Sequence, residues 1–492
     1  MAKQTRLITD VVIPNGNRSL PFGLMRMAEV QMERLGITDF LDGLKVKGVP
    51  LSTVVRAMCV YQLDGGSSMN ECGNWISDPI TAERMCGGMR ISNKTIGRAL
   101  EILSLHFDDI LDALWKGINS CYDITETDVI IDGSHIPVNG VKSKLSAQGY
   151  GAGDVQNQIQ FMVAQLRSPP LPFRVEAYAG NEPDSEQFAH FLPMIMGYLK
   201  KGSLLIMDNG GAVREILNDI KDSDMEYVTR VKMNEKDDEW IKEGMKDFIN
   251  VDGDACCLRH TFSSSQRTIY LFFSVEKYIR GINSAEKRAG KMASVAVENL
   301  YTDKKKPKQS DFLVLKHNPY VGVDVKISVQ KLLDPFDPDD NLKAIDELTG
   351  DRCGFFKLES SLPMDPATVL NVYRSRVAVE HLISSIKSVV KLRPLRVWKD
   401  SSVNGALLMA LIAQLLVSLT IVDLKGTEIE KNIRGKMVRT ISKPSPRTVV
   451  HSLGQLTVTY LEGQKGGCEV IFSNFDPLNS EIMGILDKFE AF

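Results

Sequence analysis

Four polar residues in the last third of the chain recur at helical spacing: Tyr373, Arg376, Glu380 and Lys387. Each residue of an α-helix turns the side chain by about 100°, so these four are expected on one stripe of a single helix. Lys391 continues the stripe one turn later. A carboxylate among a guanidinium, ammonium groups and a phenol predicts a site for a divalent metal and for the phosphates on which the metal acts.

Two aspartates elsewhere fit the same chemistry. Asp132 ends the apolar run 129–131, and Asp208 ends the apolar run 204–207. Each pattern is typical of a buried strand that delivers a carboxylate to the edge of a sheet. Asp132, Asp208 and Glu380 are therefore the predicted catalytic metal ligands.

The predicted chemistry is cleavage of a phosphodiester. Two Mg²⁺ ions about 4 Å apart activate the attacking oxygen and neutralise the leaving oxygen. Magnesium prefers a few hard oxygen ligands, which three carboxylates supply, and Mn²⁺ is an expected substitute. Arg376 is expected to hold a phosphate bidentately and Lys387 and Lys391 to bind the strand as point charges, while Tyr373 binds a phosphate or orients Glu380.

Each residue taken alone has a plainer interpretation. Asp132 suits a turn, and Asp208 with the following Asn-Gly-Gly is a good turn sequence. Glu380 and Arg376 suit a surface ion pair worth under about 1 kcal/mol. His135 and His381 lie near the carboxylates, but structural roles are the favoured interpretation. The combination of these motifs favours a metal site.

The elements that must position these residues begin with a mostly helical domain, 1–120, for which DNA-end binding is predicted. Ser52 is expected to cap a helix ending at Leu63. A Ser-capped helix at 91–103 has two interpretations that remain open. It is either the second helix of a helix-turn-helix with Asn93, Lys94 and Arg98 facing DNA, or a plain amphipathic helix.

Residues 121–235 change to an α/β pattern. Strands are predicted at 127–132, 157–166, 172–178, 203–208 and 225–232, with helices at 185–200 and 211–221. Asp184 and Gln187 are spaced as a capping box for the first of these helices. The order strand, strand, strand, helix, strand, helix, strand is that of the ribonuclease-H-like fold. In that fold the strands carrying Asp132 and Asp208 are neighbours.

The remaining domains follow from changes of pattern. Residues 236–350 are predicted to be a β-rich insertion, with strands at 255–262, 267–274, 311–316 and 322–330 around a helix at 284–300. The basic run 304–308 is interpreted as a solvated turn rather than a DNA contact, and 334–340 as an acidic linker. Residues 351–425 resume the core, with Asp365 and Pro366 starting the catalytic helix. Residues 426–492 show weak patterns and are a candidate dimerisation region.

Composition sets the general class. The chain of 492 residues is 43% hydrophobic and 25% charged, as in ordinary globular proteins, and its net charge is only −3. Local charge must therefore indicate a nucleic-acid partner, and the window 371–400 holds seven Lys or Arg residues. The eight cysteines form no C-x-x-C pair, which favours free thiols over a zinc site, and the N-terminus lacks a signal-peptide pattern. The uncharged stretch 405–422 is interpreted as a buried helix rather than a membrane span.

The spacing Y-x2-R-x3-E-x6-K resembles the signature of the IS-four-like DDE transposases of prokaryotic insertion sequences, and Tyr373, Arg376, Glu380 and Lys387 match it in full. Asp-Gly-Ser-His-Ile at 132–136 and Met-Asp-Asn-Gly-Gly at 207–211 are similar to the two aspartate motifs of that family. The long β-rich insertion and Leu-Arg-Pro at 392–394 are also similar. The resemblance covers about 125–425. Family members often carry Trp or other aromatic residues where this chain has Val377, Leu382 and Ile383, and these substitutions keep an apolar helix face.

The resemblance implies a cut-and-paste transposase. Such an enzyme binds the terminal inverted repeats of its element, hydrolyses a DNA strand and joins the freed 3′-hydroxyl to double-stranded target DNA. Synapsis of two ends implies a homodimer, and the resemblance places the protein in a prokaryotic cytoplasm, associated with the nucleoid and not with a membrane. Two alternatives remain: a catalytically decayed, transposase-derived DNA-binding protein, and a ribonuclease-H-like nuclease without strand transfer.

Overall fold

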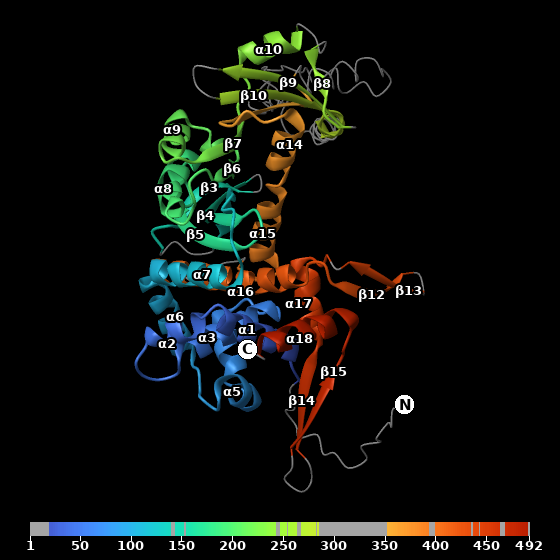
Figure 1. The fold of residues 1–492 in the computed structure, drawn as a ribbon. Helices are drawn as coiled ribbons and strands as arrows, with labels where there is room; N and C mark the ends of the chain where they lie inside the picture. Colours follow the sequence, from blue (N-terminus) through green and yellow to red (C-terminus); the bar gives the residue numbers. More distant parts are fainter. Residues whose placement is uncertain are drawn as a thin grey trace, which may run out of the picture. The chain divides into compact units, whose positions relative to one another are not determined.

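The computed structural model describes residues 19–138, 143–151, 154–242, 247–252, 254–262, 267–281, 283–284, 352–392, 399–433, 436–441, 443–462 and 468–490. Figure 1 draws the fold as a ribbon coloured along the sequence. The chain divides into two compact units. Unit 1 comprises 1–205 and 375–492, and unit 2 comprises 206–374. Each unit is described by itself below.

Unit 1 begins with the helical region predicted from the sequence. Its helices are α1 (Phe22–Arg34), α2 (Ile37–Gly43), α3 (Leu51–Leu63), α4 (Met69–Ile76), α5 (Pro79–Cys86), α6 (Asn93–Leu105) and α7 (Phe107–Cys121). The predicted cap of α6 is confirmed, because the Ser92 hydroxyl accepts a hydrogen bond from the Thr95 amide. The predicted cap of α3 is wrong. Ser52 lies inside that helix, and its amide donates to the Asp42 carboxylate instead.

The first strands of the core follow in unit 1. They are β2 (Val129–Pro137), β3 (Ala147–Gly151), β4 (Asp154–Leu166) and β5 (Pro172–Ala179). The central strand β4 pairs antiparallel with β2, β3 and β5. Helix α8 (Asp184–Met196) packs on β4 and β5. The capping-box prediction for α8 is wrong, because Pro183 is the N-cap and makes no side-chain cap, while the buried Gln187 amide donates to Gln160 and to the Glu182 carbonyl.

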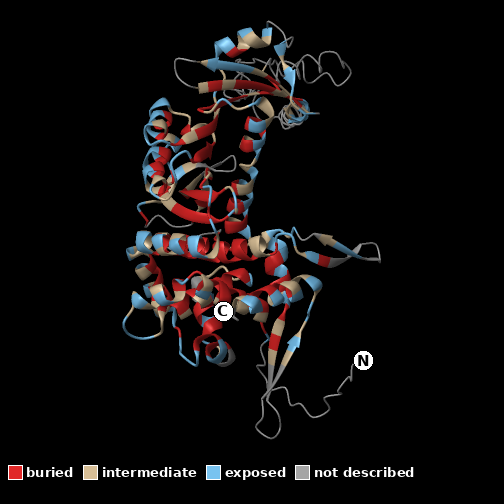
Figure 2. Ribbon diagram, viewed as in Figure 1, coloured by how far each residue is buried: buried red, intermediate tan, exposed pale blue. Residues whose placement is uncertain are grey.

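The centre of unit 1 is helix α16 (Asp400–Asp423), which packs against β5, α6, α3 and α1. Figure 2 shows much of α16 as buried. By length and composition, α16 is the one helix among the described residues that is apolar enough to cross a membrane, and 89% of its most apolar window is buried inside the protein. A Cβ at Gly405 would lie 2.1 Å from the Leu100 carbonyl oxygen of α6, so glycine permits this close packing. The interpretation of 405–422 as a buried helix is confirmed.

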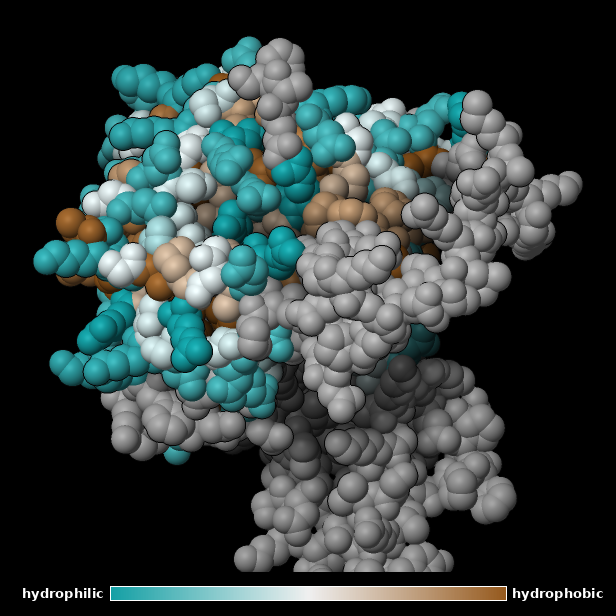
Figure 3. All heavy atoms as spheres, turned by 90° about the horizontal axis from the view of Figure 1, so that it is seen from below, coloured by the Kyte–Doolittle hydropathy of each residue, from teal (hydrophilic) through white to brown (hydrophobic). Residues whose placement is uncertain are grey.

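The C-terminal elements of unit 1 are α15 (Val377–Ser388), β12 (Glu428–Ile433), β13 (Lys436–Ile441), α17 (Pro446–Gln455), β14 (Thr457–Glu462), β15 (Cys468–Ser473) and α18 (Pro477–Glu490). Strand β14 pairs with both β15 and the N-terminal β1 (Ser19–Leu20), so the two ends of the described chain share one small sheet. Figure 3 shows one face of the molecule, on which hydrophilic residues predominate and hydrophobic areas are smaller.

Unit 2 starts within β6 (Leu204–Met207) and continues through a short 3-10 helix (Asn209–Gly211), α9 (Arg214–Asp222), β7 (Glu226–Val231), α10 (Glu235–Lys242), β8 (Ile249–Asn250), β9 (Ala255–Phe262), β10 (Arg267–Ser274), β11 (Phe355–Ser360) and α14 (Pro366–Arg374). Strands β7, β11, β10, β9 and β8 follow one another in a sheet. The predicted start of α14 is confirmed, since the Asp365 carboxylate accepts a hydrogen bond from the Thr368 amide.

The order β2, β4, β5, α8, β6, α9, β7 is the predicted order of a ribonuclease-H-like core, and the mixed α/β class is confirmed. Strand β3 is an addition that the sequence patterns did not indicate. In the insertion, the strands at 255–262 and 267–274 are confirmed. The strands predicted at 311–316 and 322–330, nearly all of the helix at 284–300, the basic run 304–308 and the linker 334–340 lie outside the described residues.

Candidate active site

Asp132 lies inside strand β2 rather than at its end. The strand continues to Pro137 because 133–137 keep pairing with β4, and Asp132 itself stands opposite Val163. Side chains alternate across a strand, so Asp132 and Ser134 share one face. The prediction that Asp132 ends its strand is therefore wrong, although the apolar run before it is buried as expected.

Helix α15 carries Glu380 and docks on the strands. It packs against β2 and β4 and buries Val379, Leu382, Ile383 and Ile386. Leu382 and Ile383, which the sequence analysis expected on an apolar helix face, are thus buried as predicted. Val377 is different, because 46% of it is exposed, and it does not contribute to the apolar face.

The expectation of a single helix from Tyr373 to Lys387 is wrong. Tyr373 belongs to α14, which ends at Arg374, and Glu380 and Lys387 belong to α15, which begins at Val377. Arg376 is the residue immediately before α15 and already has helical backbone angles. The division between the two units also falls here, between Arg374 and Ser375.

Within unit 1, the Arg376 guanidinium contacts two of the predicted metal ligands. Its Nη1 lies 3.0 Å from Asp132 Oδ2, and its Nη2 lies 2.6 Å from Glu380 Oε1. The Arg376 side chain is only 14% exposed, whereas those of Asp132 and Glu380 are 20% and 49% exposed. The other Asp132 oxygen, Oδ1, accepts a hydrogen bond of 3.0 Å from the Gly133 amide. Asp132 and Glu380, which are far apart in the sequence, therefore converge on one cation.

Lys387 also reaches β2. Its Nζ donates a 2.6 Å hydrogen bond to Ser134 Oγ and lies 5.9 Å from the centroid of the Phe161 ring. Ser134 is a neighbour of the site that sequence reasoning missed, although its position two residues after Asp132 is a usable signal. Lys391 does not continue the stripe, because α15 ends at Ser388 and Lys391 adopts a left-handed backbone conformation with φ of 60°.

Asp208 belongs to unit 2 and follows β6 directly, as predicted. It caps the 3-10 helix through a 2.8 Å hydrogen bond from the Asn209 amide to Oδ1. The Tyr373 hydroxyl donates to the same oxygen at 3.3 Å. The two interpretations of Asp208, as a turn residue and as a metal ligand, are therefore compatible, because the turn fixes the orientation of its carboxylate. Tyr373 thus contacts one of the predicted carboxylates, Asp208, whereas the sequence analysis assigned it to a phosphate or to the orientation of Glu380.

Lys277, in the insertion, lies in the electrostatic field of Asp208. Burial lowers the pKa of Lys277 to about 8, with Arg230 lowering it further and Asp208 opposing the shift. The ammonium group lies 4.6 Å from the centroid of the Phe356 ring. No sequence motif marks Lys277, because the chain fold and not local spacing brings it near Asp208.

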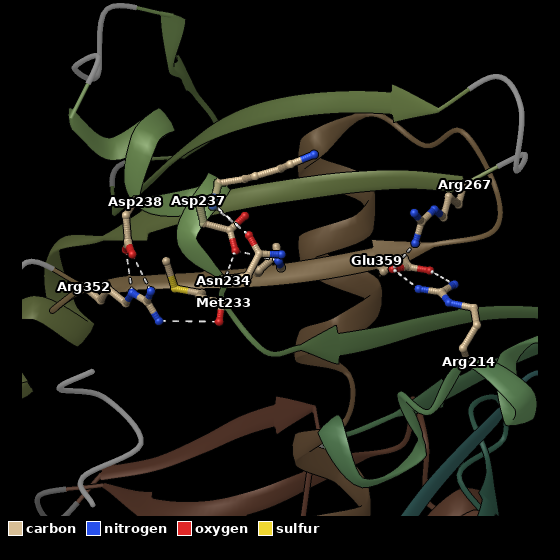
Figure 4. Close-up of polar contacts among 10 residues, drawn as sticks. Arg214, Met233, Asn234, Asp237, Asp238, Arg267, Arg352 and Glu359 are labelled. Atoms are coloured by element: carbon tan, nitrogen blue, oxygen red, sulfur yellow. Dashed lines mark hydrogen bonds and ion pairs between the residues drawn. The ribbon is translucent and has the colours of Figure 1, made fainter. Parts of the chain in front are cut away.

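A second carboxylate of unit 2, Glu359, is buried and paired with neighbouring side chains. It lies on β11 and is 2% exposed, and Arg214 Nη1, Tyr227 Oη and Arg267 Nη1 contact it at 2.8, 2.8 and 3.4 Å. Figure 4 shows both arginines directed at this carboxylate. Burial opposes ionisation, yet these partners hold the pKa of Glu359 below its usual value. Glu359 is therefore an ionised structural anchor and not a candidate ligand.

Two further ion pairs, of which Figure 4 labels Arg352 with Asp238, tie β11 and the segment just before it to α10. Lys357 Nζ lies 2.6 Å from Asp237 Oδ2, with both side chains almost fully buried. Arg352 Nε donates to Asp238 Oδ1 at 2.6 Å. Residues 352–360 return the chain from the insertion, so these pairs fix the place where the insertion rejoins the core.

The donor set suits a hard divalent cation. Asp132, Glu380 and Asp208 offer carboxylate oxygens, and the first two already contact one positive group. In the part of the chain that the structure describes, no three His, Cys, Asp or Glu side chains are grouped closely enough to hold a metal ion as they stand.

The chain matches the model of a known protein family. The model of the family described as "Transposase DDE domain" matches residues 124–416, which is more than half of the chain and spans all three carboxylates. Among solved structures, the chain is similar to a piggyBac transposase determined in a synaptic complex with hairpin DNA. The TM-score is 0.41 and the sequence identity 11%, and the match covers 91% of this chain and 81% of that chain. No curated protein matches the sequence.

Proposed function

This chain belongs to the transposase DDE domain family, and from that premise we propose that it is a Mg²⁺-dependent DNA transposase of the cut-and-paste type, from a prokaryotic insertion sequence of the IS-four-like group. Its substrate is double-stranded DNA at the terminal inverted repeats of its element. Its product is the element joined to target DNA. Two ends must be held together during the reaction, so the working form is proposed to be a homodimer.

The observation that carries this proposal is the convergence of Asp132 and Glu380 on Arg376. A surface ion pair, the plainer interpretation of Arg376 and Glu380, does not call for a second carboxylate from a different element. Two carboxylates at one cation form the kind of oxygen-rich position that a divalent metal occupies.

Asp208 is proposed as the third ligand, and the start of its strand supports this assignment. Asp128, just before β2, accepts a 2.9 Å hydrogen bond from the amide of Leu204, the first residue of β6. Asp132 and Asp208 each lie four residues further along, which corresponds to about 13 Å of strand. Strands β2 and β6 are also neighbours in one sheet.

Each of the proposed site residues then has its own role. Bound Mg²⁺ ions supply activation of the attacking oxygen and neutralisation of the leaving oxygen. The three carboxylates hold those ions, and the Asn209 amide and the Tyr373 hydroxyl orient Asp208. Arg376 and Lys387 bind phosphate oxygens of the DNA, with Lys391 as an additional cation beyond the end of α15. Water and a DNA 3′-hydroxyl are alternative nucleophiles at the same position, so one site serves both cleavage and joining.

Nicking of the element's own ends tests the proposal. The substrate is DNA from the flanks of the reading frame, supplied with Mg²⁺. Asp132→Asn, Asp208→Asn and Glu380→Gln should each lower the nicking rate by at least about a hundredfold, because each removes a charged ligand oxygen. The matched controls are Asp222→Asn and Glu186→Gln, at exposed positions of α9 and α8, and these should nick at the wild-type rate.

Nicking that persists in any one of the three carboxylate variants would remove that residue from the site. Pre-cut ends incubated with target plasmid extend the test. Joined products identify a transposase, whereas cleavage without joining identifies the nuclease alternative. DNA binding without either activity identifies the decayed alternative.

A further inference from the structure

We propose that Arg376 is a built-in competitor of the metal: in the DNA-free protein its guanidinium holds the position between Asp132 and Glu380 that a divalent ion would take. This inference rests on the proposed function, because it concerns the same carboxylates. It adds a resting state that neither the family nor the sequence signature assigns. In the signature alone, Arg376 is a phosphate-binding residue.

The competition follows from the contacts. Both oxygens of Asp132 are engaged, Oδ1 by the Gly133 amide and Oδ2 by Arg376 Nη1 at 3.0 Å. Arg376 Nη2 simultaneously holds Glu380 Oε1 at 2.6 Å. A metal ion that uses Asp132 Oδ2 and Glu380 Oε1 must replace the guanidinium, since the same oxygens cannot face both cations at short range.

The electrostatic balance makes the exchange feasible in both directions. Two carboxylates that reach the same group repel each other unless a positive charge lies between them. The guanidinium supplies one unit of charge, and the side chain is largely buried while doing so. A divalent ion supplies two units and prefers the same oxygens. Glu380 is half exposed, which gives the incoming ion access.

Arg376 is also placed where its side chain can move without disrupting the fold. It lies immediately before α15, at the break after α14, and so precedes the buried face formed by Val379, Leu382, Ile383 and Ile386. When released, a guanidinium is suited to bidentate phosphate binding. Metal binding would therefore release the Arg376 side chain, which could then bind a phosphate of the DNA.

Lys387 provides an internal contrast. It also reaches from α15 to β2, but its hydrogen-bond partner is the neutral Ser134 hydroxyl rather than a predicted ligand. Lys387 is thus not expected to compete with a metal. The alternative interpretation of Arg376 is that it only fastens α15 to β2, and in that case its loss would weaken the metal site rather than strengthen it.

Titration of Mn²⁺ into the full-length, DNA-free protein, followed by electron paramagnetic resonance of the free ion, separates the two interpretations. Arg376→Gln should bind Mn²⁺ about three- to tenfold more tightly than wild type, the factor expected from removing one partly exposed ion pair. Arg374→Gln is the matched control. Arg374 lies two residues away and also pairs with two aspartates, Asp252 and Asp254, so its loss should leave Mn²⁺ affinity unchanged.

A second readout guards against poor folding of the variant. Ligand that binds only the folded state raises the melting temperature, so Mn²⁺ should raise Tm more in Arg376→Gln than in wild type. The gain in affinity should vanish in Arg376→Gln combined with Asp132→Asn. Equal or weaker Mn²⁺ binding by Arg376→Gln, or a gain that survives loss of Asp132, would overturn the inference. Nicking by wild type that depends on Asp132 would still stand in that case, so the proposed function is judged separately.

Discussion

Arg376, just before α15, and Lys387, within α15, both reach strand β2, but the groups they contact there differ in charge. Arg376 is held by the carboxylates of Asp132 and Glu380, and Lys387 donates to a neutral hydroxyl. The two cationic side chains of the signature are therefore expected to bind phosphate at different stages of the reaction. Lys387 can contact a phosphate in the resting protein, whereas Arg376 must first exchange its partners.

DNA binding without metal tests this difference at the level of single residues. Binding that neutralises phosphates weakens with salt, and each lost contact lowers the slope of log K against log salt by about 0.9. In EDTA, Lys387→Ala should lower the slope by roughly that amount, and Arg376→Ala should change it little. With a divalent ion and uncleavable DNA, both variants should lower it.

The matched control is Lys116→Ala, an exposed lysine of α7 outside the site. Its slope should equal that of wild type. Equal slopes for Lys387→Ala and wild type, with and without metal, would show that Lys387 does not touch the DNA backbone.

Among the secondary-structure elements, those of unit 2 that surround Asp208 are joined by buried charge. Glu359 connects β11 to Arg214 of α9, Tyr227 of β7 and Arg267 of β10. An ionised group that is almost fully buried is stable only because all these donors are satisfied. The cluster therefore holds four elements in register at once.

Replacing Glu359 by Gln should lower the free energy of unfolding of unit 2 by about 2 kcal/mol at pH 7, because a charge-assisted cluster becomes a neutral one. The pKa of Glu359 is lowered in the folded protein, so its contribution is fully present above its ordinary pKa of about 4.3 and is lost as pH falls through the folded pKa. Hydrogen exchange of β11 peptides measures the loss at pH 7. Urea midpoints for wild type and variant should begin to converge below the ordinary carboxyl pKa of about 4.3 and should meet below the folded pKa of Glu359.

Stability measurements at acidic pH could contradict this prediction. A difference between wild type and Glu359→Gln that persists undiminished well below pH 4 would mean that the carboxylate contributes through shape and not through charge.

The elements also show how far sequence patterns reach. Apolar runs and caps predicted β4, β5, β6, β7, β9 and β10 closely, since strand periodicity is a local property. The position of Asp132 within β2 was missed because the strand is prolonged by pairing with β4, which no local pattern records. The break after Arg374 was missed because Ser375 and Arg376 carry no glycine or proline signal. The approach of Lys277 to Asp208 depends on chain segments far apart in the sequence and has no local signal.

For the whole molecule, the residues proposed for the site come from both compact units. Asp132, Arg376, Glu380 and Lys387 belong to unit 1, and Asp208 and Tyr373 belong to unit 2. The chain passes from one unit to the other between Leu205 and Ile206 and again between Arg374 and Ser375, within a few residues of site residues on each occasion.

Cleavage of the protein by bound iron tests the central claim most directly. Fe²⁺ in place of Mg²⁺, with ascorbate and peroxide, generates radicals that cut the backbone beside the metal. A single site built from Asp132, Asp208 and Glu380 predicts three cuts, one next to each residue, all suppressed together by excess Mg²⁺ and all lost in Asp132→Asn. Cuts at one of these positions without the others, or cuts elsewhere that Mg²⁺ suppresses, would contradict the shared site.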